Sequence, residues 1–438
     1  MAPGLIGCIG HISHMSLAVK DLKKAEVFMK KLGVIIILVF CLGAGLLAEG
    51  DYGAPGEFLS WGAGARSMGL GRAFTGLADD PSAVIYNPAG LAQQNPLQIS
   101  LQHVILFYDT MYDFAAVTYP LSGIGTFAGS YIRLGSTGFD SRDSQWATTG
   151  SFGVTSQAFL ISYARDITGW LASGVNLKLI SESVYDRSAM GYGADLGLMF
   201  KPHEMINIGL ALINAIPASI KLNETAESFP IVFKFGLAFK FLGERVIPVL
   251  DFEKSFSNKD FKFRLGLEAY PIQDLALRVG LDETELTFGA GYFIKPVRID
   301  YSLSSQELGL THRASITLAF GGFDINLKAE PSIFSPVGIR KTTTVSIYAV
   351  TKYPINEWEL NIINEDGDAV RTYSGDDNPP ATVIWNGKDD RGLPVQDGEY
   401  KLVMKIKDKN GRTIESGKET VRVSSSIPLQ PGALKLEE

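Results

Sequence analysis

The sequence predicts an all-β protein whose central part, residues 95–321, forms an antiparallel transmembrane β-barrel of about fourteen strands. Apolar and polar side chains alternate through this region, as in Phe233-Lys234-Phe235, and strand side chains point to opposite faces with period two. Many runs reach about ten residues, the length that a tilted strand needs to cross a bilayer. The polar face also carries charged residues in mid-strand, which suits a barrel lumen.

A soluble β-sandwich is the alternative, because its strands alternate as well and its solvent face accepts charges. Ordinary strands are about five or six residues long, however, and these runs are longer. Glycines inside the strands favour a curved sheet or a crowded lumen. Aromatic residues near the ends of runs, such as Tyr119, Trp170 and Tyr292, suit the interfacial girdles of a membrane barrel.

An even strand number places both ends of the barrel on the same side of the membrane, which is the periplasmic side in bacterial barrels. The expected strands begin near Leu97, Asp113, Gly123, Phe152, Trp170, Met190, Ile206, Ile231, Val246, Phe261, Leu275, Leu286, Val297 and Leu310.

Composition argues against several classes of function. The formal net charge of -7 makes nucleic acid an unexpected partner. The chain has two cysteines, Cys8 and Cys41, both upstream of the expected cleavage site, and its five histidines show no metal-ligand spacing. No spacing brings Ser, His and Asp together as a catalytic group. We therefore expect no enzyme activity, no cofactor and no metal.

The N-terminal region has the pattern of a secretory signal. Residues 29–48 carry a basic start, a short apolar core and Ala48 before a polar residue, which predicts cleavage after Ala48. An uncleaved anchor and a lipoprotein attached through Cys41 are the alternatives. Within residues 1–28, the stretch from Gly10 to Leu22 resembles the opening strand and helix of the glyoxalase-like vicinal oxygen chelate family, but the rest of that fold is missing. We interpret them as an upstream extension, with Met29 as the true start.

A segment rich in small residues, 49–94, precedes the first strand. Its glycines lack the strand before and the Gly-Lys-Ser/Thr after that a phosphate loop needs. The element Asn87-Pro88-Ala89-Gly90-Leu91-Ala92 and the stretch before it resemble the PorV/PorQ family of outer-membrane proteins, and the element is shared with FadL-type transporters of hydrophobic compounds. The resemblance implies a plug or hatch inside the barrel. The residues that it marks are Gly69, Gly71, Asp79, Asp80, Asn87, Pro88 and Gly90.

Other stretches of the barrel agree with this family. Residues 207–214 with Ile220-Lys221, and Asp300-Tyr301-Ser302 with residues 308–313, resemble internal family elements, although the family usually has a small or amide residue where Leu310 stands. The run that ends at Phe320 resembles the terminal aromatic signal read by the barrel-assembly machinery.

Charged residues on the polar face are candidates for the lumen. They could form a solute path, or they could pair with the plug, and we expect pairing because narrow barrels are usually filled. The candidates are Lys178, Asp195, Arg264, Glu268, Arg278, Arg298 and Asp300.

The character of the chain changes after residue 321. Residues 322–337 are expected to be a linker, 338–424 a β-sandwich domain and 425–438 a disordered tail. The sandwich resembles the FlgD-type Ig-like module, with a tryptophan, two tight turns and Asp-Gly-x-Tyr before a strand. Asp389 and Asp390 could suggest calcium, but solvated turns are expected. The residues of the Ig-like motif are Trp385, Gly387, Asp389, Gly392, Asp397, Gly398 and Tyr400.

Three functions follow from this interpretation, with protein export as the main one and the other two as alternatives. The resemblance to PorV implies a role in protein export, with secretion-system proteins or exported cargo as partners. The resemblance to FadL implies passive uptake of a hydrophobic solute, with the hatch around Asn87-Pro88 moving. A structural scaffold is the third. In each case we expect the outer membrane of a Gram-negative-type bacterium, with lipid around the barrel and the Ig-like domain in the periplasm.

Overall fold

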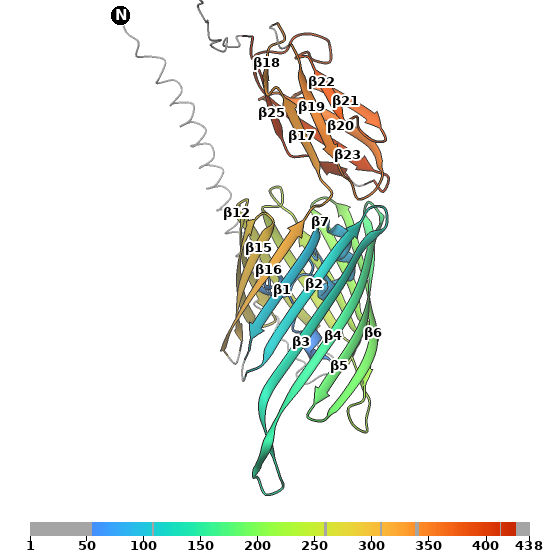
Figure 1. The fold of residues 1–438 in the computed structure, drawn as a ribbon, viewed down its shortest axis with the longest axis vertical. Helices are drawn as coiled ribbons and strands as arrows, with labels where there is room; N and C mark the ends of the chain where they lie inside the picture. The colour runs from blue at the N-terminus through green and yellow to red at the C-terminus, as the bar shows by residue number, and fades with distance from the viewer. Residues whose placement is uncertain are drawn as a thin grey trace, which may run out of the picture.

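The computed structural model describes residues 55–106, 109–257, 261–306, 309–337, 341–411 and 413–425. Fourteen strands form a closed antiparallel barrel in which β1 pairs with β16, and a smaller β domain stands at one end of it (Figure 1). The predicted barrel and its strand number are therefore confirmed. The barrel strands are β1 (Leu97–Ile105), β2 (Met111–Leu121), β3 (Gly125–Arg142), β4 (Thr148–Thr168), β5 (Leu171–Val184), β6 (Arg187–His203), β7 (Ile206–Ile216), β10 (Val232–Phe239), β11 (Val246–Ser255), β12 (Phe261–Ile272), β13 (Leu275–Asp282), β14 (Glu285–Ile294), β15 (Val297–Gln306) and β16 (Gly309–Phe320).

Residues 55–94, which we call the plug, fill the lumen (Figure 1). The plug contains only short helices: η1 (Glu57–Leu59), α2 (Ala65–Gly69), α3 (Ala83–Tyr86) and η2 (Pro88–Gln93). Pro88 opens η2, where its missing N–H is no loss, and the Asn87 side chain accepts a hydrogen bond from Ala89 N. Small residues keep the segment narrow enough for a lumen of this size.

The two ends of the barrel differ. At the end next to the C-terminal domain the connections are short, such as residues 122–124, 169–170 and 204–205. At the other end β3 and β4, with 18 and 21 residues, project as a long hairpin (Figure 1). There the β7–β10 connection also carries the small pair β8 (Ser219–Ile220) and β9 (Glu227–Ser228).

The C-terminal domain is a sandwich of two sheets around a core that includes Phe334, Trp358, Trp385 and Tyr400. The prediction of a linker at 322–337 is wrong, because this range contains two strands of the sandwich. Residues 325–330 alternate apolar and polar and pair with β19, and residues 333–334 pair with β25. The strands are β17 (Ile325–Glu330), β18 (Ile333–Phe334), β19 (Thr343–Ala349), β20 (Ile355–Ile363), β21 (Ala369–Asp376), β22 (Thr382–Trp385), β23 (Gly398–Asp408), β24 (Thr413–Glu415) and β25 (Glu419–Val423).

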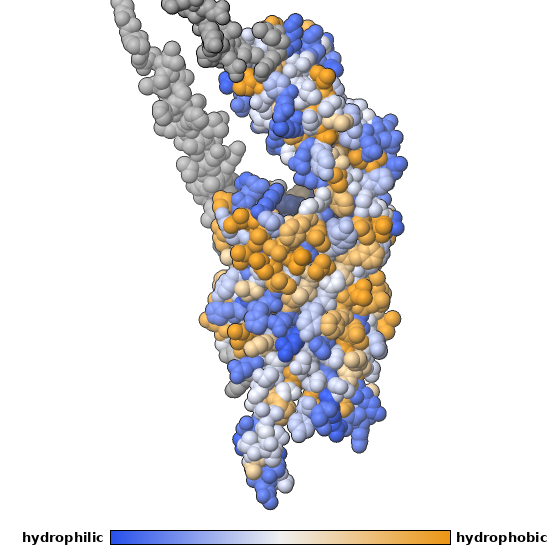
Figure 2. All heavy atoms as spheres, in the orientation of Figure 1, coloured by the Kyte–Doolittle hydropathy of each residue, from blue (hydrophilic) through white to orange (hydrophobic). Residues whose placement is uncertain are grey.

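The outward positions of the barrel strands are mostly apolar, as a wall in contact with lipid requires. On the face drawn in Figure 2, apolar residues gather on the part of the barrel next to the C-terminal domain, and more polar residues lie toward the far end. Aromatic pairs lie at the near end, including Phe127 with Tyr163 at 4.9 Å between ring centroids and Trp170 with Phe200 at 6.3 Å. Within the described ranges, no helix is both long and apolar enough to cross a membrane.

The expected upstream extension and signal, residues 1–48, lie outside the described residues, as does nearly all of the expected tail.

Candidate functional site

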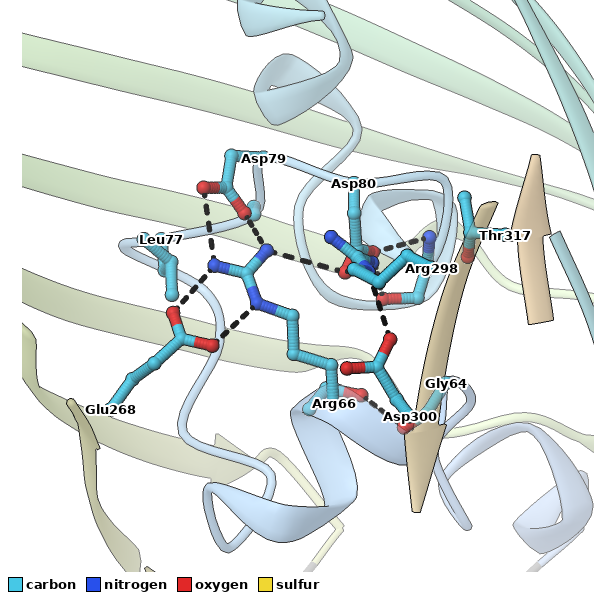
Figure 3. A network of polar contacts seen from close by, with 12 residues as sticks. Gly64, Arg66, Leu77, Asp79, Asp80, Glu268, Arg298, Asp300 and Thr317 are labelled. Carbon is cyan, nitrogen blue, oxygen red and sulfur yellow. Dashed lines mark hydrogen bonds and ion pairs between the residues drawn. The ribbon is translucent and has the colours of Figure 1, made fainter. Parts of the chain in front are cut away.

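The lumen is the candidate site, and one side of it is lined by ions. We call the inward faces of β10–β15 the charged wall. Arg66 of α2 reaches this wall and binds Glu268 through two hydrogen bonds, Nε to Oε1 at 2.9 Å and Nη2 to Oε2 at 2.7 Å. The same guanidinium binds Asp79 of the plug (Figure 3). Planar, bidentate arginine–carboxylate pairs combine charge with fixed geometry, so Arg66 holds α2 in one orientation.

Four of the predicted lumen charges extend this network along the wall. Arg278 Nε donates to Glu268 Oε1 at 2.7 Å, and its Nη1 lies 2.9 Å from Asp300 Oδ1. Arg298 joins the wall to the plug, with Nε 2.8 Å from Asp300 and Nη2 3.1 Å from Asp80 (Figure 3). The lumen charges and the plug motif therefore neutralise each other rather than facing an open path.

A second ionic group lies further along the charged wall. Arg264 donates to Glu253 at 2.8 Å and to Asp282 at 2.7 Å, and Arg72 of the plug binds the same Asp282. Asp251 accepts hydrogen bonds from the backbone N–H groups of Phe74 and Thr75, at 2.9 and 2.8 Å.

The third group contains the remaining two predicted lumen charges. Lys178 Nζ donates to Asp195 Oδ1 at 2.6 Å, and Asn176 donates to Asp195 at 2.9 Å and to Val84 O of the plug at 2.8 Å. Close by, the Asn87 amide donates to Thr75 O at 3.1 Å and to Leu198 O at 3.0 Å. Asn87 of the motif therefore joins the plug to β6 and also joins two parts of the plug to each other.

Glycines let the plug backbone approach the wall. Gly71 has a φ of 63°, and a Cβ there would lie 2.7 Å from the Leu281 backbone. A Cβ at Gly76 would lie 2.8 Å from the backbone of Gly236 and Leu237. A larger residue at either position would push the plug away from the charged wall. The other two motif glycines, Gly69 and Gly90, also lie against backbone, of Gly289 and Ala78 respectively.

The opposite side of the lumen is apolar. We call the inward faces of β1–β4 the apolar wall, because its buried residues are mainly hydrophobic and its polar ones are Ser, Thr and Gln. Lumens of membrane barrels are usually polar, so this surface is unusual. The apolar residues of the wall are Val104, Tyr112, Phe114, Ala116, Ala128, Ile132, Ala158, Leu160 and Ala164.

The first residues of the plug cover this wall through apolar contacts. Trp61 stacks on Tyr112 with 6.4 Å between ring centroids and 21° between ring planes. Phe58 and Leu59 of η1 belong to the same hydrophobic cluster. Phe229, from the connection that carries β8 and β9, lies against Gly56. The end of the lumen far from the C-terminal domain is thus closed by two segments that meet through apolar side chains.

The C-terminal domain closes the other end with a buried lysine. Lys352, in the connection between β19 and β20, is 1% exposed, and its Nζ donates to Ala92 O of the plug at 2.6 Å and to Thr126 Oγ1 at 2.9 Å. The Gly123 N–H donates to Lys352 O at 2.6 Å. The Asp166 N–H donates to Tyr353 Oη at 3.3 Å, and burial raises the pKa of the Tyr353 phenol. The domain is therefore fixed to the barrel and to the end of the plug.

The Ig-like motif residues have structural positions. Trp385 is buried and donates to Lys388 O at 3.0 Å, and the Tyr400 hydroxyl donates to Gln396 O at 2.7 Å. Asp389 accepts from the N–H groups of residues 391 and 393, which fixes the turn that contains Gly392. Asp397, next to Gly398, accepts from the hydroxyl and N–H of Ser425, and these hydrogen bonds lower its pKa. Within the described ranges no group of acidic, His or Cys residues could hold a metal.

Sequence reasoning missed several residues of the site. Arg66 and Arg72 are basic residues in a segment of small residues, and this contrast could have marked them. Asp282 lies on the same face of its strand as Arg278, so the alternation of apolar and polar residues could have predicted it as a lumen residue. Lys352 carries no local signal, because its role depends on how a later domain docks.

Comparison with known proteins identifies the C-terminal domain. Residues 336–410 match the family model described as FlgD Ig-like domain. This confirms the Ig-like prediction, while membership of the PorV/PorQ family stays a prediction. No curated protein matches the chain.

Solved structures similar to the barrel include a toluene transporter and a monoaromatic hydrocarbon channel. The Pseudomonas putida toluene transporter TodX is 16% identical with a TM-score of 0.45, over 59% of this chain and 98% of that one. The Ralstonia pickettii toluene transporter TbuX is 16% identical with a TM-score of 0.45, over 59% of this chain and 99% of that one. A Pseudomonas aeruginosa FadL homologue is 12% identical with a TM-score of 0.41, over 64% of this chain and 100% of that one.

Proposed function

We propose that this protein is an outer-membrane channel for small hydrophobic solutes, in which the first residues of the plug move along the apolar wall. The observation that carries the proposal is the apolar wall itself, including Phe114, Ile132 and Leu160 on inward positions of three consecutive strands. A purely structural barrel could hold its plug through ion pairs alone, as the charged wall does. A continuous apolar surface inside a barrel suits a ligand that water solvates poorly.

The orientation follows from the connections. Bacterial barrels have short periplasmic turns and longer extracellular loops. The short turns, both ends of the barrel and the Ig-like domain lie at one end, which we assign to the periplasm (Figure 1). The β3–β4 hairpin and the apolar contacts around Trp61 then face the cell exterior, where a solute would enter.

The part of the plug that moves is residues 55–61. This segment contacts the barrel through Phe58, Leu59 and Trp61, whose apolar contacts can exchange for a hydrophobic solute. The expected hatch around Asn87-Pro88 has a different role in this mechanism. Asn87 makes directional hydrogen bonds to two carbonyls, and a Cβ at Gly174 would lie 2.4 Å from Pro88, so this element acts as an anchor.

The test is uptake of labelled toluene by outer-membrane vesicles that contain the protein. Phe114→Asn places an amide on the apolar wall and should reduce uptake about tenfold, since burying an amide without a partner costs about 1–3 kcal/mol. Ser304→Asn is the matched control, because Ser304 points inward from β15 and binds Arg313 at 2.9 Å. A boiled-versus-unboiled gel shift checks that each variant folds. Wild-type vesicles that take up no more toluene than empty ones would reject the proposal and favour a structural role.

A protein-binding role is the second candidate, favoured by the exposed end of the β3–β4 hairpin. Trp146 at its turn is 78% exposed, and Phe139 packs on Phe152 at 5.5 Å. Exposed aromatic residues on a projecting hairpin suit a protein partner, as export of cargo would require. Cross-linking of intact cells through Trp146→Cys tests this role. One reproducible adduct with another protein supports export, and the absence of any such adduct rejects it.

A further inference from the structure

A polar cluster lies on the outer, lipid-facing surface of the barrel. His103, Asp113 and Arg133 are direct cross-strand neighbours on β1, β2 and β3. His103 Nδ1 lies 2.6 Å from Asp113 Oδ1, and Arg133 Nη1 lies 3.6 Å from Asp113 Oδ2. Their side chains are 56%, 31% and 37% exposed, so they face out of the barrel. We call these three residues the outer polar cluster.

The cluster adjoins a groove of about 640 Å³ in the same outer surface. Ala115 and Ala314 form its floor, because they stand among much larger outward neighbours. Leu101 pairs with Ala115 on one side and with Ile316 on the other, and Tyr131 pairs with Ala115 from β3. Small residues between large ones leave an apolar trough along β1, β2 and β16.

The polarity along this groove has a direction. Along β1, Leu101 precedes His103, and β1 begins at the end of the barrel that carries the Ig-like domain. Along β2 the chain runs back, and Asp113 precedes Ala115. The part of the trough at Leu101 and Ala115 is therefore nearer the proposed periplasmic end, Ala314 stands opposite His103, and Asp113 and His103 are nearer the cell exterior. A lipid of the outer leaflet has the same order, with its polar group outermost and its acyl chains directed inward.

The chemistry of the cluster suits a phosphate group. A guanidinium has five N–H donors, and one carboxylate shared with His103 engages few of them. Arginine binds phosphate through charge-assisted hydrogen bonds, and the His103 ring is a second polar group beside it. In a bilayer a charged group on the outer wall is costly unless it has a polar partner, and the head group of a lipid is the partner within reach.

We propose that this surface binds one phosphorylated lipid of the outer leaflet, with an acyl chain on Ala115 and Ala314 and its phosphate on Arg133 and His103. The site goes beyond the proposed channel function. It depends on the orientation proposed above, and solute uptake is not required for it. A second copy of the barrel is a poorer occupant, because a convex barrel wall does not fill a groove.

The test uses the purified protein in detergent, with bisphosphorylated lipid A as the probe and native mass spectrometry to count bound lipid. We expect one retained lipid on the wild type. Arg133→Gln removes the charge and Ala314→Leu fills the trough, and each should weaken retention about tenfold or more. Lipid A without phosphate should bind the wild type about as weakly as phosphorylated lipid A binds Arg133→Gln.

Matched controls come from the same outer surface. Lys254→Gln removes an outward cation on β11, and Ala290→Leu enlarges an outward alanine on β14. Both should retain lipid as the wild type does, and the gel shift on boiling verifies folding of all four variants. Retention as strong as the wild type's in Arg133→Gln and Ala314→Leu, a loss of the same size in the two controls, or protein dimers in place of bound lipid would each overturn the proposal. A channel that fails to take up toluene would leave this result unaffected.

Discussion

The two walls of the lumen hold the same plug by different means. The charged wall uses ion pairs and hydrogen bonds with fixed geometry, centred on Arg66 and Glu268. The apolar wall holds residues 55–61 by packing, as between Trp61 and Tyr112, and its Gln102 accepts a hydrogen bond only further along the plug, from Gly64 N. Directional contacts lose most of their strength when one partner shifts, whereas apolar contacts are non-directional and can be replaced by other apolar groups. The comparison shows how one plug can be anchored on one side and displaceable on the other.

Breaking the charged wall should have the largest effect. Glu268→Gln leaves Arg66 and Arg278 buried without their shared carboxylate, and removing one partner of a buried ion pair costs about 3–5 kcal/mol. We expect a clear fall in the temperature at which the barrel loses its fast gel mobility. Glu244→Gln is the control, since its pair with Lys240 is exposed and is worth about 0–1 kcal/mol. Equal melting of the two variants would show that the ionic network does not anchor the plug.

Removing the lysine at the end of the barrel next to the Ig-like domain should have a smaller and more local effect. Lys352→Met keeps the length of the side chain but loses the hydrogen bonds to Ala92 and Thr126, at a cost of about 1–3 kcal/mol. We expect faster hydrogen exchange in residues 88–96 and little change in residues 65–80, which the charged wall holds. Lys405→Met, at an exposed lysine of the same domain, should change neither segment. Unchanged exchange at 88–96 would mean that the Ig-like domain does not restrain the plug.

The sequence predicts some parts of this arrangement and not others for a physical reason. Period-two alternation reports which side of a strand faces the lumen, so Arg264, Glu268 and Arg278 were identified as lumen residues from sequence alone. It does not report what lies across the lumen, because the partner of Glu268 is 202 positions away in the chain. The contrast between the two walls was missed for the same reason. Phe114 and Ile132 alternate regularly, and only closure of the barrel shows that they face inward together.

The docking of the Ig-like domain could not be predicted from the sequence either. Residues 325–330 alternate like a strand, yet they follow the barrel closely, where a linker is expected. Their pairing with β19 depends on a sheet formed by later residues. Lys352 lies between two such strands, and its contact with Ala92 joins residues 260 positions apart.

A tether between the plug and each wall tests the central claim most directly. After removal of residues 1–48, which contain both cysteines, Trp61→Cys with Tyr112→Cys joins the plug to the apolar wall through a thiol cross-linker. Thr75→Cys with Asp251→Cys joins the plug to the charged wall, where Thr75 N lies 2.8 Å from Asp251 Oδ2. We predict that the first tether abolishes toluene uptake and that the second leaves it unchanged. Uptake that survives the first tether, or that is blocked equally by both, would contradict a plug that moves along the apolar wall.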